Sequence, residues 1–275
     1  MNQKQQRELS FGTVLPFDMK ITYAELTRDV EPTTADSHVH PECEIYICLS
    51  GDVSFMVEQQ IYPILPGSIV ITRPYEYHHC IYHSDEPHKH FWILFSANGN
   101  ESLLPRFFER ENGERNLLVL SADGRRELFA LCHSMIDEPL SEAERQYCFF
   151  RLLNLLDRAE VMSDQDYGVD DAMSSALAYL DEHFCDSITV RELASVAHVS
   201  VNTLERHFQQ KLHMTPMSYL KKKRLAHAAA CLYEGCSVSE ACEKSGFSDY
   251  SHFIALFKKT YGMTPLKYKK EVTGN

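Results

Sequence analysis

The feature that most constrains this chain of 275 residues is a segment near its C-terminus that is written twice. A shift of 49 residues superposes the later copy on the earlier one around Phe257, and upstream the shift falls to 48 because one residue is inserted. The coinciding pairs, later copy first, are Phe257 and Phe208, Met263 and Met214, Thr264 and Thr215, Pro265 and Pro216, Tyr268 and Tyr219, Ser237 and Thr189, and Glu240 and Glu192. The sequence therefore predicts one local fold built twice.

Each copy carries the signals of two helices joined by a tight turn. A hydroxyl followed three residues later by a glutamate, as in Thr189 and Glu192, is a capping box that begins the first helix. The chain then reverses at His198 or Gly246, and a second helix follows with two apolar residues four apart on its buried side. Those residues are Leu204 and Phe208 in one copy and Phe253 and Phe257 in the other. The pattern is typical of helix-turn-helix units.

A long helix is predicted between the copies, from about residue 216 to residue 233. Thr215 supplies the capping hydroxyl, and Pro216 suits the first helical position. At about 1.5 Å per residue this helix is roughly 27 Å long. Such a spacer suits two recognition helices in successive major grooves, about 34 Å apart on one face of a duplex.

Residues from about 172 to 270 resemble the DNA-binding domain of the AraC/XylS family of transcription regulators. The resemblance rests on Ala241-Cys242, Gly246-Phe247-Ser248-Asp249, Ser251, Phe253, Phe257-Lys258-Lys259, Gly262 and Thr264-Pro265. It implies base contacts from Asn202, Glu205 and Arg206 in the first unit and from Tyr250, Ser251 and His252 in the second. Arg206 is suited to bidentate pairing with guanine, whereas Ala255 stands where the family often has an arginine.

The charge distribution favours DNA over the alternative of an all-α module for protein contacts. Residues 200–275 hold twelve Lys and Arg against six Asp and Glu, a net charge of +6 within a chain of net −12. A basic run on the long helix suits phosphate contacts, which position a protein without specifying sequence; the alternative is a solvated helix face. The run consists of Lys221, Lys222, Lys223 and Arg224.

The first hundred residues alternate between apolar and polar positions, which predicts strands at residues 44–49, 53–57, 68–71 and 91–95. We therefore expect an α+β chain: an N-terminal antiparallel β-barrel with helices, then an all-α domain of two helix-turn-helix units joined by the long helix. The predicted domains are a barrel over residues 1–100, a helical dimerisation region over 101–165, a linker over 166–174 and a DNA-binding domain over 175–275.

The barrel resembles the cupins, since His38, His40, Glu44 and Gly51 have the spacing of the first cupin motif. The second motif is half present: Pro66-Gly67 fits, Tyr75 replaces the usual glycine, and either His78 or His79 takes the place of the histidine. The shared parity of His38, His40 and Glu44 predicts one strand that aims all three inward. With His78, they are a ligand set for a divalent transition metal.

Three interpretations of this barrel site stay open. The resemblance implies a sensor that needs no cofactor, in which a small polar effector, preferably a carbohydrate, contacts His38, His40, Glu44, Tyr46, His78 and Trp92. The alternatives are a metal site at His38, His40, Glu44 and His78, in a metal- or stress-sensing regulator or a metal-dependent enzyme, and a structural hydrogen-bonded cluster. We expect no enzymatic activity. His83, His88 and His90 are predicted in a solvated loop.

Helices are predicted at residues 103–109, 125–136 and 142–161. The third carries an apolar stripe of Tyr147, Phe150, Leu153, Leu156 and Ala159, and the resemblance implies that it pairs with a second copy in a homodimer. Promoter DNA and RNA polymerase are the other expected partners. A polar N-terminus and the lack of long apolar runs predict a cytoplasmic protein without membrane contact, and nine scattered cysteines predict reduced thiols.

Overall fold

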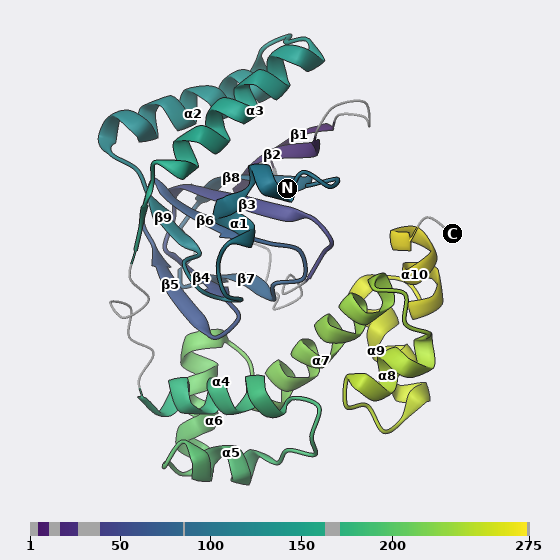
Figure 1. The fold of residues 1–275 in the computed structure, drawn as a ribbon. Helices are drawn as coiled ribbons and strands as arrows, with labels where there is room; N and C mark the ends of the chain where they lie inside the picture. The colour runs from purple at the N-terminus through teal and green to yellow at the C-terminus, as the bar shows by residue number, and fades with distance from the viewer. Residues whose placement is uncertain (1–4, 11–16, 27–38, 85, 163–170, 274–275) are drawn as a thin grey trace. The chain divides into compact units, whose positions relative to one another are not determined.

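The computed structural model describes residues 5–10, 17–26, 39–84, 86–162 and 171–273 (Figure 1). Its backbone contacts divide the chain into a first unit of residues 1–32, 42–76 and 82–167 and a second unit of residues 33–41, 77–81 and 168–275. The first unit is built on antiparallel strands and the second on helices, so the predicted α+β class is confirmed. Within the described part of the chain, no helix has the length and hydrophobicity needed to cross a bilayer.

Two antiparallel sheets hold the strands. The larger has the order β1-β2-β8-β3-β6-β9-β10 and the smaller the order β5-β4-β7. The sheets are not closed into a single barrel, which refines the prediction. The strands are β1 Gln5–Ser10, β2 Asp18–Leu26, β3 Cys43–Ser50, β4 Val53–Val57, β5 Gln60–Ile64, β6 Ser68–Thr72, β7 His78–Tyr82, β8 His88–Ser96, β9 Leu117–Val119 and β10 Glu160–Val161.

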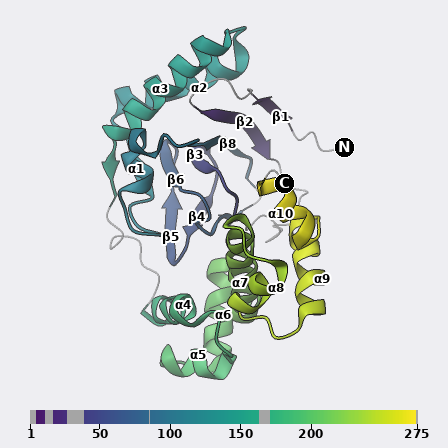
Figure 2. The ribbon, with the colours of Figure 1, turned by 45° about the vertical axis from the view of Figure 1, so that its right-hand side comes forward.

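Helices cover the outer face of the larger sheet (Figures 1 and 2). After η2 (Glu101–Leu103) and α1 (Pro105–Phe108), the chain forms α2 (Ala122–Asp137) and α3 (Glu142–Asp157). Phe17, Phe95 and Phe149 meet edge to face in the core between sheet and helices, with ring centroids 5.0 to 5.9 Å apart. Full burial of one such side chain contributes roughly 2 to 3 kcal/mol, so this layer fixes α2 and α3 on the sheet.

The predicted apolar stripe of α3 is confirmed in part: Leu153, Leu156 and Ala159 are buried, but Tyr147 and Phe150 are not. Tyr147 and Phe150 are 64% and 39% exposed, whereas Phe149 and Leu152 are fully buried. Both exposed residues lie directly after a buried residue, Gln146 or Phe149, and one residue turns an α-helix by about 100°. The buried face of α3 consists of Gln146, Phe149, Leu152, Leu153, Leu155 and Leu156.

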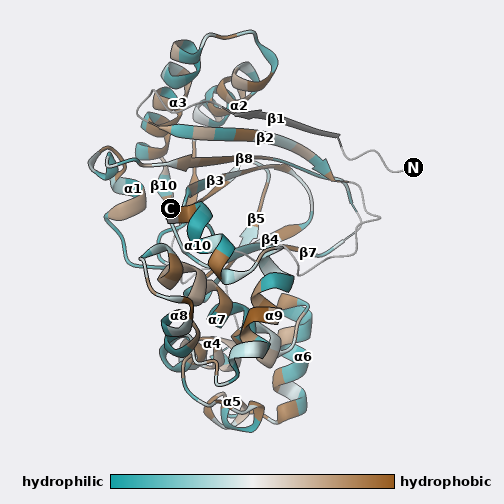
Figure 3. Cartoon of the chain, turned by 90° about the vertical axis from the view of Figure 1, so that its right-hand side faces the viewer, coloured by the Kyte–Doolittle hydropathy of each residue, from teal (hydrophilic) through white to brown (hydrophobic). Residues whose placement is uncertain are grey.

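The second unit contains the predicted repeat. Its helices are α4 Asp171–His183, α5 Val190–Val196, α6 Val201–Leu212, α7 Pro216–Tyr233, α8 Val238–Lys244, α9 Tyr250–Tyr261 and α10 Pro265–Thr273. Both capping boxes, at the starts of α5 and α8, are present, and α7 spans the predicted range. Brown and teal residues alternate along these helices in Figure 3, as amphipathic helices require. All nine cysteines are free thiols, as predicted.

Both copies turn at residues in the left-handed region, and the first copy does so without glycine. His198 (φ 55°) corresponds to Gly246 (φ 73°), and His213 (φ 51°) corresponds to Gly262 (φ 71°). The caps of the second helices, Ser200 and Asp249, differ by 49 positions, so the inserted residue lies inside the turn of the later copy. The turn is therefore one residue longer there.

We expect Gly246→Ala to destabilise the second unit by about 2 to 4 kcal/mol, because an added Cβ combines left-handed strain with overpacking. That Cβ would lie 2.7 Å from the Cα of Cys185. His198→Ala is the matched control, since a Cβ already exists there and the side chain is exposed; its effect should stay within about 0.5 kcal/mol. Urea unfolding followed by helical circular dichroism measures both, and equal losses would refute the argument.

Candidate DNA-binding helices and ligand-binding face

The six side chains expected to contact bases all lie exposed near the starts of α6 and α9. Asn202, Glu205 and Arg206 occupy the first two turns of α6, and Tyr250, Ser251 and His252 occupy the first turn of α9. The opposite sides of the same helices are fully buried at Leu204, Phe208, Phe253 and Phe257. Each second helix is thus anchored by two apolar residues four apart and presents its polar side to solvent.

The two helices differ in their strongest candidate for a base contact. Arg206 and Ala255 occupy equivalent positions 49 residues apart, and both are exposed. A guanidinium donates two parallel hydrogen bonds to guanine, which a methyl group cannot do. Exposed Lys258 and Lys259 in the last turn of α9 carry positive charge instead, and positive charge suits phosphate contacts.

The basic run on α7 is divided between surface and interior. Lys221 is exposed and Lys222 half-buried, but Lys223 is 7% exposed and forms an ion pair with Asp181. Arg224 donates from Nε to the carbonyl of Phe184 and from Nη2 to that of Asp186, both at 2.6 Å, and burial lowers its pKa. Lys223 and Arg224 therefore hold α7 against α4 and the segment that follows α4. The predicted contacts with DNA phosphates stay a prediction for Lys221 and Lys222 only.

A second candidate site is the inner face of the larger sheet, the side opposite α2 and α3. Strand register places Thr22 opposite Trp92, Trp92 opposite Tyr46, and Glu44 opposite Thr72. Directly paired residues of antiparallel strands share one face. The ring of Tyr46 lies 4.7 Å from that of Phe55 on β4, so this face is turned toward the smaller sheet.

Hydrogen bonding fixes the tautomer of His88 on this face. Its Nδ1 lies 2.8 Å from the carbonyl oxygen of Ser50, which can only accept, so Nδ1 carries the proton. Nε2 is then the acceptor for the Tyr46 hydroxyl at 2.7 Å. Burial lowers the pKa of His88, so the ring is held neutral and Tyr46 is oriented by it.

His90 lies at the centre of a stack of rings. Its centroid is 4.5 Å from His88, 5.0 Å from Trp92 and 5.2 Å from Tyr46. Burial, reinforced by the neighbouring His88, lowers the pKa of His90 to about 3. Its Nδ1 has no hydrogen-bond partner among the described residues, and neither do the buried hydroxyls of Thr22 and Thr72. Three polar atoms on one face are therefore available to a bound molecule.

The structure corrects the expectation for two of the later histidines. His83 is exposed as predicted, but His88 and His90 are 1% and 2% exposed within β8. The alternation expected for residues 91–95 continues toward the N-terminus through Trp92, His90 and His88. This period of two in the sequence could have extended the predicted strand to include both histidines.

The predicted cupin residues are brought together only in part. Glu44 lies on β3, but His40 precedes that strand, which begins at Cys43, so one strand does not carry both. His38 lies outside the described residues. His40, Glu44 and His78 nevertheless offer one ligand atom each within 4.8 Å of one another, and the rings of His40 and His78 are 5.0 Å apart. The structure thus selects His78 over His79.

Tyr75, which replaces the motif's glycine, adopts the left-handed conformation that glycine would supply, with φ 63°. The adjacent Glu76 is fully buried and pairs with Arg110 at 2.5 and 2.6 Å. It also accepts from the amides of Arg73 and Gly113 and from the side chain of Asn116. These hydrogen bonds stabilise the turn after β6 despite the left-handed backbone strain at Tyr75.

Comparison with known proteins agrees with both halves of this description. Residues 26–156 match the AraC-like ligand binding domain family, and residues 193–271 match a helix-turn-helix domain family. The chain is 26% identical to the HTH-type transcriptional activator RhaS of Escherichia coli O1:K1 over 246 residues, 83% of this chain and 85% of that protein. The structure of ToxT of Vibrio cholerae O395 aligns over 98% of both chains at 15% identity, with a low TM-score of 0.40.

A ligand-binding sheet domain followed by two helix-turn-helix units defines a transcription regulator with a ligand-binding domain. The chain belongs to the AraC/XylS family of these regulators.

Buried neutral His90 makes the first unit less stable in acid. Below pH 6.5 the imidazole of His90 takes up a proton in the unfolded chain, but in the folded chain it stays neutral because its pKa is lowered to about 3. The free energy of unfolding therefore falls by about 2 kcal/mol from pH 7 to pH 5. His90→Phe should flatten this dependence, and His133→Gln, at an exposed histidine, should leave it unchanged. Urea unfolding followed by fluorescence of Trp92, the single tryptophan, measures it; an unaltered slope in His90→Phe would contradict the assignment.

Proposed function

We propose that this protein is a sequence-specific transcription activator whose engagement with promoter DNA is controlled by a small polar molecule on the inner face of its sheets. The observation that carries the DNA-binding part is the matched pair of amphipathic helices, α6 and α9, each with an exposed polar start. Activation is proposed because the similar RhaS protein is named an activator. Contact with RNA polymerase is part of that proposal.

We expect Arg206→Ala to lose about 1 to 3 kcal/mol of binding free energy at one base pair and to relax preference there, because the bidentate fork is lost. Arg206→Lys is the matched control: it keeps the charge but not the fork, so it should retain phosphate-type affinity without the preference. The duplex would be selected from a random pool by wild-type protein, and affinities measured at fixed salt. Equal loss on every duplex would make Arg206 a phosphate contact.

A carbohydrate is our preferred effector for the inner face. Sugars combine hydroxyls that hydrogen-bond with faces that stack on aromatic rings, and this face offers both kinds of partner. Its aromatic side chains are Tyr46 and Trp92, and its hydrogen-bonding groups include Glu44, His90, Thr22 and Thr72. Alternating polar and aromatic groups of this kind typically fix the orientation of a small ligand. The ligand would act through differential affinity for two arrangements of the protein.

Dimerisation through α3 is proposed on its exposed aromatic side chains. Tyr147 and Phe150 are large, solvent-exposed and three residues apart on one helix, and Arg151 lies 5.9 Å from the Tyr147 ring. Sedimentation of the full chain should show a two-chain species that Phe150→Asp weakens. We also propose that the protein acts in the cytoplasm and has no enzymatic activity.

A metal-sensing regulator is the second candidate, favoured by the grouping of His40, Glu44 and His78. Zinc holds nitrogen and oxygen ligands at about 2.1 Å, so tetrahedral ligand atoms lie roughly 3.4 Å apart. The three atoms would need a modest inward movement to bind one ion. Two imidazoles and a carboxylate suit zinc, iron or manganese.

Metal content decides between the candidates. If the inner face senses metal, protein purified without chelator retains about one ion per chain, and His40→Ala loses it because one of three ligands is gone. His133→Ala, on exposed α2, is the matched control. Elemental analysis measures the ion. Absence of a stoichiometric ion from wild-type protein, even after incubation with zinc, would remove this candidate.

A further inference from the structure

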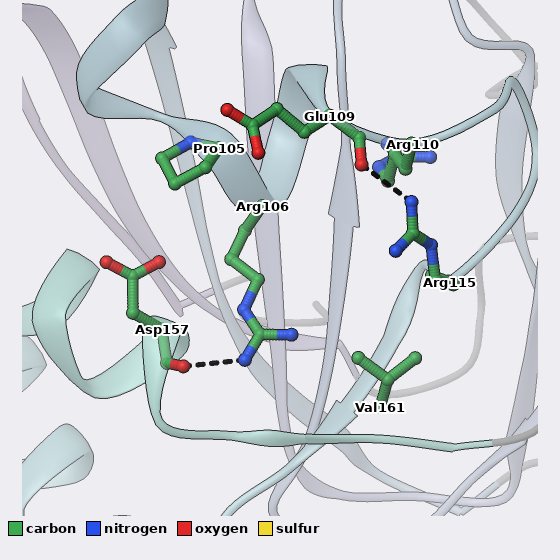
Figure 4. A pocket seen from close by; sticks show the side chains of 7 residues that line it. All are labelled: Pro105, Arg106, Glu109, Arg110, Arg115, Asp157 and Val161. Atoms are coloured by element: carbon green, nitrogen blue, oxygen red, sulfur yellow. Dashed lines mark hydrogen bonds between the residues drawn. The ribbon is translucent and has the colours of Figure 1, made fainter.

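Polar groups without a role in DNA or effector binding occur in both units. In the first unit, arginines line a pocket of 350 Å³, but they already have partners within the protein (Figure 4). Nη2 of Arg106 donates to the carbonyl of Asp157, and Nη2 of Arg115 donates to that of Glu109, both at 2.6 Å. In the second unit, two thiols at the end of α7 have chemistry that the roles described above leave unused.

The end of α7 is a Schellman motif that brings two cysteines together. Gly235, with φ 95°, is the left-handed residue that follows the helix, and its amide donates to the carbonyl of Leu232 at 3.2 Å. The amide of Cys236 donates to the carbonyl of Cys231 at 2.9 Å. These two hydrogen bonds define the motif, in which the side chains at the positions of Cys231 and Cys236 commonly form an apolar contact. Here both sides of that contact are thiols.

The backbone geometry suits a disulfide between these thiols. Because a 2.9 Å hydrogen bond links the amide of Cys236 to the carbonyl of Cys231, bond lengths keep the two Cα atoms within roughly 6 Å of each other. Disulfides span Cα distances of about 4.4 to 6.8 Å. The thiols also interact in the reduced protein. Burial raises the pKa of Cys231 to about 11, and the charge and hydrogen bonding of Cys236 add to that rise.

Polar neighbours give the two thiols different tasks. Nζ of Lys244 lies 3.3 Å from Sγ of half-buried Cys236, and a nearby lysine favours the thiolate, the form that attacks oxidants. Cys231 is 5% exposed, and its Sγ lies 3.7 and 4.0 Å from the ring nitrogens of His227. Burial lowers the pKa of His227, so the ring is neutral and one of its nitrogens can accept the thiol proton.

We propose that Cys231 and Cys236 are a redox-active dithiol that a hydroperoxide oxidises to a disulfide. The Cys236 thiolate attacks the hydroperoxide, the O–O bond breaks, and the leaving oxygen takes up the proton that Cys236 had released, which leaves a sulfenic acid on Cys236. Sγ of Cys231 then attacks Sγ of Cys236 and the S–O bond breaks. The departing hydroxide becomes water with the proton that Cys231 gave to His227. One hydroperoxide is thereby reduced by two electrons, and two thiols become one disulfide.

The bridge would act on the second helix-turn-helix unit because the turn is fastened to that unit. Nζ of Lys269 on α10 donates to the carbonyls of Gly235 and Cys236 at 2.8 and 3.0 Å, and Lys244 is the last residue of α8. Oxidation draws the Cys236 sulfur into the disulfide and so weakens its hydrogen bond with Lys244. The redox chemistry is independent of DNA, while any effect on DNA affinity rests on the proposed regulatory function.

Peptide mass mapping of the full chain after treatment with hydrogen peroxide tests the site. A glutamate-specific protease cuts after Glu234 and Glu240, which places Cys231, Cys236 and Cys242 in three different peptides. The expected product is a linked pair of peptides that holds Cys231 and Cys236 and that dithiothreitol separates. A bridge between other cysteines, or no bridge at all, would overturn the proposal.

Variants separate the tasks of the two thiols. Cys231→Ser should leave Cys236 as a sulfenic acid that dimedone labels, whereas Cys236→Ser should form no bridge and take no label at Cys231. Lys244→Met should slow bridge formation about threefold or more, while Lys244→Arg, which keeps the charge, should stay near the wild-type rate. Cys185→Ser, at an exposed thiol, is the matched control and should form the bridge as wild type does.

An unchanged rate in Lys244→Met would refute the role given to Lys244, and dimedone labelling of Cys231 in Cys236→Ser would refute the assignment of the two thiols. Because DNA is absent from these measurements, their failure is distinct from failure of the base-contact test with Arg206.

Discussion

The first unit depends on one buried ion pair, that of Glu76 with Arg110. Both side chains are almost fully buried, and an uncompensated charge there would cost several kcal/mol. The pair joins the strained corner after β6 to the segment between α1 and β9, because Glu76 also accepts from Gly113 and Asn116. Asn116 in turn donates to the carbonyl of Ile71 on β6. Strand β6 of the larger sheet, the strained corner at Tyr75 and the segment between α1 and β9 are therefore parts of a single hydrogen-bonded network.

The larger sheet performs two tasks because its side chains alternate. Odd-numbered residues of β3 such as Ile45 pack with α2 and α3, and even-numbered residues such as Tyr46 face the smaller sheet. The apolar face supplies stability, which leaves the other face free to hold polar groups. Those groups are buried, and His90 and Thr22 each have a polar atom without a hydrogen-bond partner among the described residues, which a bound ligand or ordered water could satisfy.

The two copies of the helix-turn-helix fold carry different residues at equivalent positions. Histidine stands at both left-handed positions of the first copy and glycine at both of the second, and Arg206 stands where the second copy has Ala255. The same backbone is thus kept while the surface differs. This difference supports the proposal that α6 supplies the specific base contact and that α9 contributes more through charge. In the α7 run, Lys221 is exposed and Lys222 half-buried, so the proposed phosphate contacts are limited to these two side chains.

Local patterns in the sequence were sufficient for the repeat, its capping boxes, α7 and the main strands, because caps, turns and alternation depend on neighbours within a few residues. Parity within the strand also predicted that Glu44 faces inward, while Tyr46 and Trp92 were expected through the resemblance to barrel sensors. Local patterns failed where the outcome depends on residues far apart: the exposure of Tyr147 and Phe150 on α3, the burial of His88 and His90, and the use of Lys223 and Arg224 inside the second unit. The Glu76–Arg110 pair joins residues 34 apart in the sequence, and the hydrogen bonds of Arg106 to Asp157 and Ala159 join residues 51 and 53 apart. Tertiary structure alone decided these, since burial and charge pairing are set by what packs against a side chain and not by its neighbours in the chain.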